Sequence, residues 1–146
     1  MEALRPGLVL VLVLCAAGSV QGQPPGVKER YVHFLEQHVD ANMNAHKCTS
    51  VMGRLRLTEP DGKTCKAVNT FIQADKDQVK EICTSGTTVG NLVQSGQPFP
   101  LIKCTFNGGK PYYPHCEYRG VQVTRYIRIA CDQGWPVHYG GDIILV

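Results

Sequence analysis

Six cysteines constrain the fold of this chain more than any other feature of its sequence. They are widely spaced, at Cys48, Cys65, Cys83, Cys104, Cys116 and Cys131. An even number of cysteines at such spacings is typical of a secreted domain with three disulfides, and the six could pair in fifteen ways. A zinc site would need close pairs such as C-x-x-C, which the sequence lacks. We therefore expect a fold held by three long-range cross-links.

The seventh cysteine, Cys15, lies in an N-terminal segment that resembles a secretory signal peptide. Arg5 supplies a positive charge, Leu8–Ala17 form an apolar run, and Val20-Gln21-Gly22 places small residues near a cleavage point. The run is too short to span a bilayer comfortably, and no later stretch is longer, so we expect no stable membrane insertion. The sequence predicts a signal peptide over residues 1–22 and one secreted, extracellular domain over residues 23–146.

The charge of the chain is mildly basic. The formal net charge is +3 at pH 7, and loss of residues 1–22 removes one base and one acid. A basic excess favours contact with a polyanion, but this excess is far below that of a protein that coats membranes or nucleic acids by electrostatics alone.

Apolar periodicity predicts three helices. From Val27 the helical stripe runs through Tyr31, Phe34, Leu35, His38 and Val39. His38 could therefore be a packed core residue, whereas His33 is interpreted as solvated. A second helix is predicted around Cys48, Val51, Met52 and Leu55. A third, capped by Asp75 or Asp77, is predicted around Val79, Ile82 and Cys83.

Alternating patterns predict strands after the third helix. Val89–Val93 could form one strand, and Leu101–Phe106 forms another that ends in a turn at Asn107-Gly108-Gly109. The longest pattern runs over Val121–Cys131, with one apolar and one wet face. A final strand would place Val137 and Tyr139 on one side and His138 on the other, where an ordinary strand histidine is the alternative interpretation. Helices and strands together predict an α+β domain.

The heptad Cys65–Phe71 carries the polar groups most suited to chemistry. As a strand it would place Lys66, Val68 and Thr70 on one face and Ala67, Asn69 and Phe71 on the other. A disulfide at Cys65 would fix the backbone that aims the Lys66 ammonium, and the Thr70 hydroxyl can both donate and accept. A solvated strand beside a structural cysteine is the alternative interpretation.

Three segments together resemble the pancreatic ribonuclease A superfamily. The heptad matches its C-K-x-x-N-T-F signature, Phe34–Asp40 resembles the first-helix segment with its catalytic histidine, and Pro136-Val137-His138 resembles its closing motif. The cysteine series resembles the six-cysteine, angiogenin-like branch. The resemblance implies three helices packed on a V-shaped, twisted antiparallel sheet. It also implies the disulfides Cys48–Cys104, Cys65–Cys116 and Cys83–Cys131.

The same resemblance implies an RNA endonuclease that uses no metal or cofactor. Such cleavage needs a base for the 2′-hydroxyl, an acid for the leaving 5′-oxygen and a cation for the phosphoryl charge. Two imidazoles, which titrate near neutral pH, and an ammonium meet these needs. The implied roles are general base for His38, general acid for His138 and transition-state stabiliser for Lys66.

The resemblance further implies how RNA would bind. Gln37 would hydrogen-bond the phosphoryl group, and Thr70 would read a pyrimidine, which gives cleavage 3′ of C or U through a 2′,3′-cyclic phosphate. Further substrate-binding residues would be Asn69, Val137 and Tyr139.

Two positions depart from the family pattern. Gly140 stands where the family commonly has an aspartate that orients the second histidine, so we expect reduced activity unless Asp142 reaches His138. Gly141 stands where angiogenins often carry a glutamine that obstructs the pyrimidine pocket, so that block should be missing. The fourth disulfide of the digestive enzymes is also absent, which would leave Thr84–Gln97 available as a partner-binding loop.

Three functions compete at this point. The leading hypothesis is a secreted endoribonuclease that prefers pyrimidines and acts as a monomer. The second is an angiogenin-like signalling protein that promotes angiogenesis through a cell-surface receptor and could meet a cytosolic ribonuclease inhibitor. The third is a host-defence antibacterial protein, against which the mild charge argues.

Overall fold

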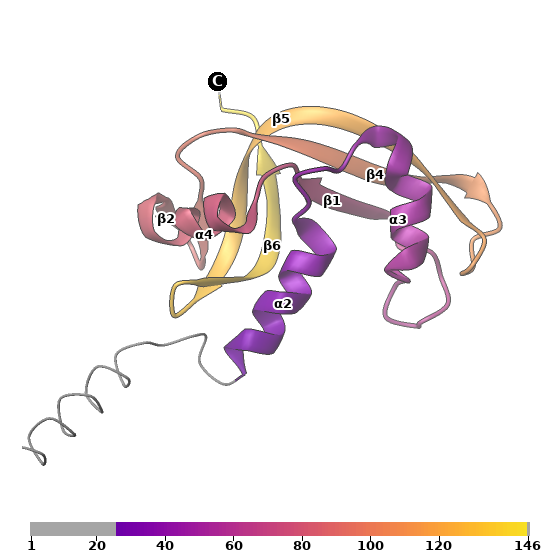
Figure 1. Ribbon diagram of the computed structural model, residues 1–146, viewed down its shortest axis with the longest axis horizontal. Helices are drawn as coiled ribbons and strands as arrows, with labels where there is room; N and C mark the ends of the chain where they lie inside the picture. Colours follow the sequence, from indigo (N-terminus) through magenta and orange to yellow (C-terminus); the bar gives the residue numbers. More distant parts are fainter. Residues whose placement is uncertain (1–25, 146) are drawn as a thin grey trace, which may run out of the picture.

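The computed structural model describes residues 26–145, so the signal peptide predicted over residues 1–22 lies outside the described part (Figure 1). The helices within this part are α2 (Val27–His38), the 3-10 helix η1 (Ala45–Lys47), α3 (Cys48–Arg54) and α4 (Lys76–Ser85). The strands are β1 (Val68–Ile72), β2 (Thr87–Val89), β3 (Leu92–Gln94), β4 (Phe99–Gly109), β5 (Cys116–Asp132) and β6 (Trp135–Ile143). None of these helices is long and apolar enough to cross a membrane.

The strands form one antiparallel sheet in which β5 is shared by two groups. The order is β1-β4-β5-β3-β2, and β6 also pairs with β5. The half of β5 from Cys116 to Arg125 pairs with β4, whereas its second half pairs with β6 and β3. Figure 1 shows β5 curving from one group into the other, so the sheet has two arms. The predicted α+β fold, with three helices on a V-shaped antiparallel sheet, is confirmed.

The helices pack on the sheet over two buried clusters. One lies beside α3 and contains Met43, Met52, Phe71, Ile102 and Tyr118, together with four half-cystines. The other contains residues of α2, α4, β4 and the second half of β5, namely Phe34, Val79, Ile82, Leu101, Ile127 and Ile129. α2 contacts β1 in one arm of the sheet and β6 in the other. It can therefore place side chains between the two arms.

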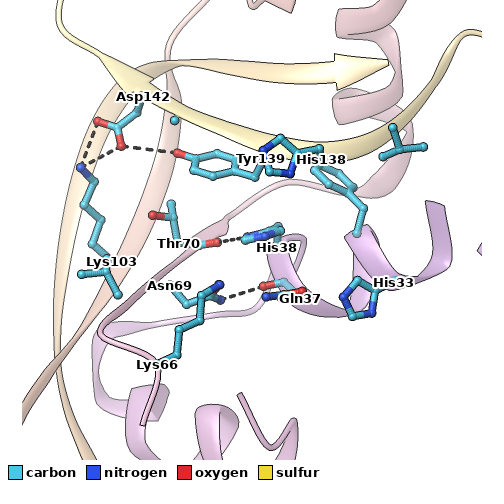
Figure 2. Close-up of a pocket in the computed structure, with 14 residues that line it drawn as sticks. His33, Gln37, His38, Lys66, Asn69, Thr70, Lys103, His138, Tyr139 and Asp142 are labelled. Carbon is cyan, nitrogen blue, oxygen red and sulfur yellow. Dashed lines mark hydrogen bonds and ion pairs between the residues drawn. The ribbon is translucent and has the colours of Figure 1, made fainter. Parts of the chain in front are cut away.

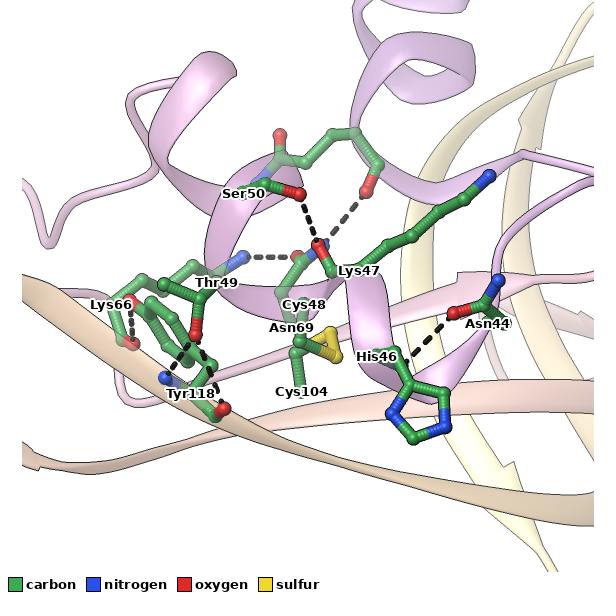
Figure 3. The surroundings of a disulfide bond; sticks show 11 residues. Asn44, His46, Lys47, Cys48, Thr49, Ser50, Lys66, Asn69, Cys104 and Tyr118 are labelled. Carbon is green, nitrogen blue, oxygen red and sulfur yellow. Dashed lines mark hydrogen bonds between the residues drawn. A yellow bond between two sulfur atoms is a disulfide. The ribbon is translucent and has the colours of Figure 1, made fainter.

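Three disulfides fasten helices and loops to the sheet. Cys48–Cys104, Cys65–Cys116 and Cys83–Cys131 have Cα–Cα distances of 5.5, 5.6 and 5.9 Å. This is the pairing that the resemblance implies. The bridges close long loops, with sequence separations of 56, 51 and 48 residues, and each such bridge stabilises a fold by about 2–4 kcal/mol. Figure 3 shows the Cys48–Cys104 bridge next to Asn69 and Tyr118. This disulfide therefore packs against the segment Cys65–Phe71, to which Asn69 belongs.

The start of α4 shows which of the two predicted caps is used. The Asp75 carboxylate accepts from the backbone N–H groups of Asp77 and Gln78, and the Gln78 side chain accepts from the Asp75 backbone. This reciprocal capping box satisfies donors that the first helical turn leaves open. Asp75 is therefore the cap, and Asp77 is not.

Three local predictions are wrong. Val89–Val93 is not one strand, because Gly90, with φ of 64°, and Asn91 form a two-residue turn between β2 and β3. The segment 107–109 is not a turn, because its glycines produce a register shift within β4 and the strand continues to Gly109. The central strand does not start at Cys65, since β1 begins at Val68.

Candidate functional site

A pocket of about 450 Å³ opens where α2, β1, β4 and β6 meet. It is lined by His33, Phe34, Gln37, His38, Lys66, Val68, Asn69, Thr70, Lys103, Val137, His138, Tyr139, Gly141 and Asp142. Every catalytic and substrate-binding residue proposed from the sequence is in this set. Figure 2 shows that the labelled side chains approach the pocket from separate elements, with His38 from α2, Thr70 from β1 and His138 from β6.

His38 is held in one orientation by the neighbouring strand. It is the last residue of α2, and its Nδ1 lies 2.8 Å from the Thr70 carbonyl oxygen. Because a carbonyl oxygen can only accept, Nδ1 carries a proton and donates, which leaves a lone pair on Nε2 of the neutral ring. Tyr139 stacks on the same ring, with centroids 5.1 Å apart and planes inclined by 25°. The ring of His38 is thus held in one orientation and lines the pocket.

Burial keeps the His38 ring neutral. Desolvation lowers the pKa of His38 from 6.5 to about 4, and the positive charge of Lys66 acts in the same direction. The hydrogen bond to Thr70 opposes this shift. In the absence of a bound anion the ring is therefore unprotonated at neutral pH, as a general base requires.

Lys66 is held by its backbone and by its ammonium. Its carbonyl oxygen accepts from the Tyr118 hydroxyl at 2.7 Å (Figure 3). The preceding Cys65 is bound to Cys116. The Lys66 Nζ donates to Asn69 Oδ1 at 2.9 Å, and Asn69 Nδ2 donates to the Gln37 carbonyl oxygen at 2.8 Å. Burial lowers the pKa of Lys66. A chain of contacts thus joins the ammonium to the helix that carries His38.

Lys66 lines the pocket together with Val68 and Thr70, the residues predicted to share its face, but its hydrogen bond to Asn69 does not follow from the strand pattern. Strict alternation would place Lys66 beside Thr70 and opposite Asn69, but Lys66 precedes the first residue of β1 and escapes the strand period. Its side chain can therefore turn back to the buried Asn69. Asn69 acts here as a structural link as well as a lining residue.

His138 is held far less tightly. It is an exposed residue of β6, opposite Ala130. Within residues 26–145, no carboxylate hydrogen-bonds its ring; Asp142 instead contacts Lys103 and Tyr139. At Gly140 a Cβ would lie 2.7 and 3.0 Å from the two methyl carbons of Leu92 and 3.1 Å from the Arg128 carbonyl oxygen, so an aspartate there requires at least that the Leu92 side chain moves. Asp142 does not replace that aspartate.

The space beside Thr70 is not closed by residue 141. Gly141 has φ of 134°, and a Cβ there would meet no atom within 4 Å. Lys103 and Asp142 lie at this side of the pocket instead, and Lys103 is the register partner of Thr70. A planar base could enter next to Thr70 and Tyr139.

Six lining residues have no catalytic or substrate-binding role predicted from the sequence, namely His33, Phe34, Val68, Lys103, Gly141 and Asp142. His33 is exposed, as predicted, and it also lines the pocket from one helical turn before Gln37, a spacing that the sequence does display. Lys103 and Asp142 had no assigned base-pocket role because their proximity depends on the register of β4 with β5 and of β6 with β5. Within residues 26–145, no group of three His, Cys, Asp or Glu side chains could hold a metal ion.

Comparisons with known proteins agree with this fold and pocket. The sequence matches the pancreatic ribonuclease family over residues 29–140. It is 42% identical over 142 residues to Ribonuclease-like 3 of Danio rerio, across 94% of this chain and 95% of that protein. It is 43% identical over 142 residues to Angiogenin-4 of Mus musculus, across 94% of this chain and 92% of that protein.

A solved structure gives the same answer for the fold. The X-ray structure of zebrafish RNase5 is 49% identical, covers 82% of this chain and 98% of that chain, and superimposes with a TM-score of 0.78. The fold is therefore ribonuclease A-like. With its family match, its relatives and its three disulfides, the chain belongs to the pancreatic ribonuclease family, in the angiogenin-like branch.

Proposed function

We propose that this protein is a secreted endoribonuclease that cleaves single-stranded RNA on the 3′ side of pyrimidines without a metal ion. The observation that carries the proposal is the convergence of His38, Lys66 and His138 on one pocket, from three segments distant in the sequence. The family is typically one of metal-independent RNA endonucleases, which supports the same conclusion.

The reaction is a transphosphorylation within the RNA. His38 Nε2 takes the proton of the 2′-hydroxyl, and the 2′-oxygen forms a bond to phosphorus. The bond from phosphorus to the 5′-oxygen breaks as His138 gives that oxygen a proton. The products are a 2′,3′-cyclic phosphate and a new 5′-hydroxyl.

The charge that develops on the phosphoryl oxygens needs compensation. The Lys66 ammonium, partly buried and already ordered by Asn69, supplies it with little reorganisation. Gln37 adds a neutral donor. A bound phosphate also raises the pKa of His38 toward neutrality, because an adjacent anion favours the protonated ring.

Base selection rests on the residues beside the phosphate. Thr70 is buried in β1, and its hydroxyl suits both cytosine and uracil because it can donate or accept. Asn69, Val137 and Tyr139 complete the surroundings of the scissile nucleotide. The space beside Gly141 favours a pyrimidine site that is open.

The compartment follows from the cross-links. Three disulfides persist in an oxidising environment, and the family is typically secreted. We therefore assign residues 1–22 as a signal peptide and residues 23–146 as the mature, monomeric enzyme.

Cleavage of RNA by the refolded mature chain tests the proposal. We expect release of cyclic phosphates from poly(C) and poly(U), loss of this activity in His38→Ala, and retention in His46→Ala, an exposed histidine remote from the pocket. Activity of the parent no greater than that of His38→Ala would refute the assignment.

A second candidate function is angiogenin-like signalling, with weak nuclease activity serving vessel growth. It is favoured by the 43% identity to mouse Angiogenin-4. The test is an endothelial growth response to the mature chain. Loss of that response in Lys66→Ala, with retained cell binding, would connect the signal to RNA cleavage and to a separate surface receptor site.

A further inference from the structure

An ion pair forms part of the pocket beside Thr70. The Lys103 Nζ lies 3.0 Å from Oδ1 and 2.8 Å from Oδ2 of Asp142. The Tyr139 hydroxyl contacts the same carboxylate at 3.4 Å. Figure 2 shows Asp142 between Lys103 and Tyr139, on the side of the pocket away from Lys66. This position is next to the base rather than to the phosphate.

Register fixes how close the pair is to the base-reading residue. Thr70 and Lys103 are direct partners in the antiparallel pairing of β1 with β4, so their side chains lie on the same face as neighbours. A pyrimidine that presents its N3 edge to Thr70 therefore presents its 4-substituent toward Lys103 and Asp142.

The two members of the pair differ in accessibility. The Asp142 side chain is 13% exposed, and both of its oxygens already have partners. The Lys103 side chain is 34% exposed. An ammonium has three N–H donors and no acceptor, so Lys103 retains donor capacity that can point into the pocket.

The pyrimidines differ at the atom that would meet this donor. Uracil carries a carbonyl oxygen at position 4, which accepts, whereas cytosine carries an amino group there, which donates. An ammonium can hydrogen-bond the uracil oxygen but faces the cytosine amino group as donor against donor.

We propose that the Lys103–Asp142 pair makes this pocket selective for uracil, with Lys103 donating to O4 and Asp142 limiting the strength of that preference. This inference rests on the proposed function, since it concerns the base pocket of the same site. The carboxylate neutralises part of the ammonium charge, so the two residues act in opposite directions on selectivity.

The test measures binding of uridine 3′-phosphate and cytidine 3′-phosphate to the mature chain by calorimetry, at one pH and salt concentration. We expect the parent to bind the uridine nucleotide more tightly. Lys103→Met, which keeps the length of the side chain, should reduce the uridine-to-cytidine affinity ratio by about tenfold. Lys103→Arg should keep this affinity ratio, and Asp142→Asn should raise it by about twofold. The control is Lys110→Met, at an exposed lysine outside the pocket, which should leave the ratio unchanged.

Opposite shifts in Lys103→Met and Asp142→Asn support the inference, because a purely structural pair would weaken both nucleotides together. An unchanged ratio in Lys103→Met, or a fall in Asp142→Asn, overturns it. If Lys103→Met loses its near-UV circular dichroism, the sign of the Asp142→Asn shift decides alone. A parent that discriminates the nucleotides but cleaves neither UpA nor CpA would overturn the proposed function and leave this inference standing.

Discussion

His38 and His138 line the same pocket but are held in different ways. The His38 ring donates to Thr70, stacks on Tyr139 and belongs to a helix linked through Gln37 and Asn69 to Lys66. His138 is exposed on β6, and in the described part of the chain no side chain hydrogen-bonds its ring. Of the two histidines proposed to exchange protons with RNA, His38 is thus held by its neighbours, whereas His138 is left exposed.

This difference indicates which group is affected by having glycine, rather than the family's aspartate, at position 140. It is His138, which has no side-chain partner among the described residues to orient it. A preorganised group loses little entropy when the transition state forms, whereas a side chain without a partner has to be ordered in each turnover. For the proposed RNA cleavage we therefore expect the rate to be limited by the placement of His138.

Removal of each imidazole should give the largest effects. His38→Ala should lower kcat/KM for UpA by about 10³–10⁴-fold, and His138→Ala by about 10²–10³-fold, since a poorly ordered acid contributes less of the normal gain. Steady-state kinetics on both variants measure the gap. An equal loss in the two variants would contradict the asymmetry.

The pH dependence of stability should report the buried state of His38. Its folded pKa of about 4 lies below the ordinary 6.5, so between these values the unfolded chain binds a proton that the folded chain does not. The contribution is fully present above about pH 6.5 and is lost as the pH falls toward 4, by on the order of 3 kcal/mol. Urea unfolding of the parent and of His38→Gln across this range should show the difference, and parallel curves would contradict it.

The link between the two ordered groups should be sensitive to Asn69. Asn69→Ala leaves the Gln37 carbonyl and the Lys66 ammonium without their partner, which should cost about 1–3 kcal/mol of unfolding free energy and lower kcat. Chemical denaturation and kinetics measure the two effects. The control is Asn107→Ala, an exposed residue of β4 that should change neither quantity.

A carboxylate at position 140 should have the smallest effect and should reduce the asymmetry. Because a Cβ there would meet Leu92, we expect a gain only with Leu92→Ala. In that background Gly140→Asp should raise kcat by roughly tenfold by orienting His138, whereas Gly140→Asn, of equal shape but without charge, should raise it less. No difference between the two would mean that His138 needs no such partner.

The sequence is sufficient where the signal is local. The first helix, the cap at one of two predicted aspartates and the three motifs all depend on neighbouring residues. The structure has α2 over Val27–His38, Asp75 as the cap and residues of all three motifs in one pocket. The heptad shows the limit of such reasoning. Period two assumes that the strand has begun, but β1 begins only at Val68, so the ammonium of Lys66 turns toward Asn69.

Pairings between distant strands were beyond reach for a physical reason. The proximity of Lys103 to Asp142 requires the register of β4 on β5 and that of β6 on β5, and the latter contains two irregularities. A shift of one residue reverses the face of every side chain, so no periodic pattern reveals which charges meet. The sequence alone is therefore compatible with Asp142 as a partner of His138, and only the strand register shows that its partner is Lys103.

The shared strand β5 also limits how the protein can respond to a ligand. Both arms of the sheet share the strand β5. Neither arm can therefore move toward the other as a rigid body unless the hydrogen-bonded backbone of β5 bends. The width of the groove is accordingly set during folding, and substrates must be accommodated by rotation of side chains such as His138.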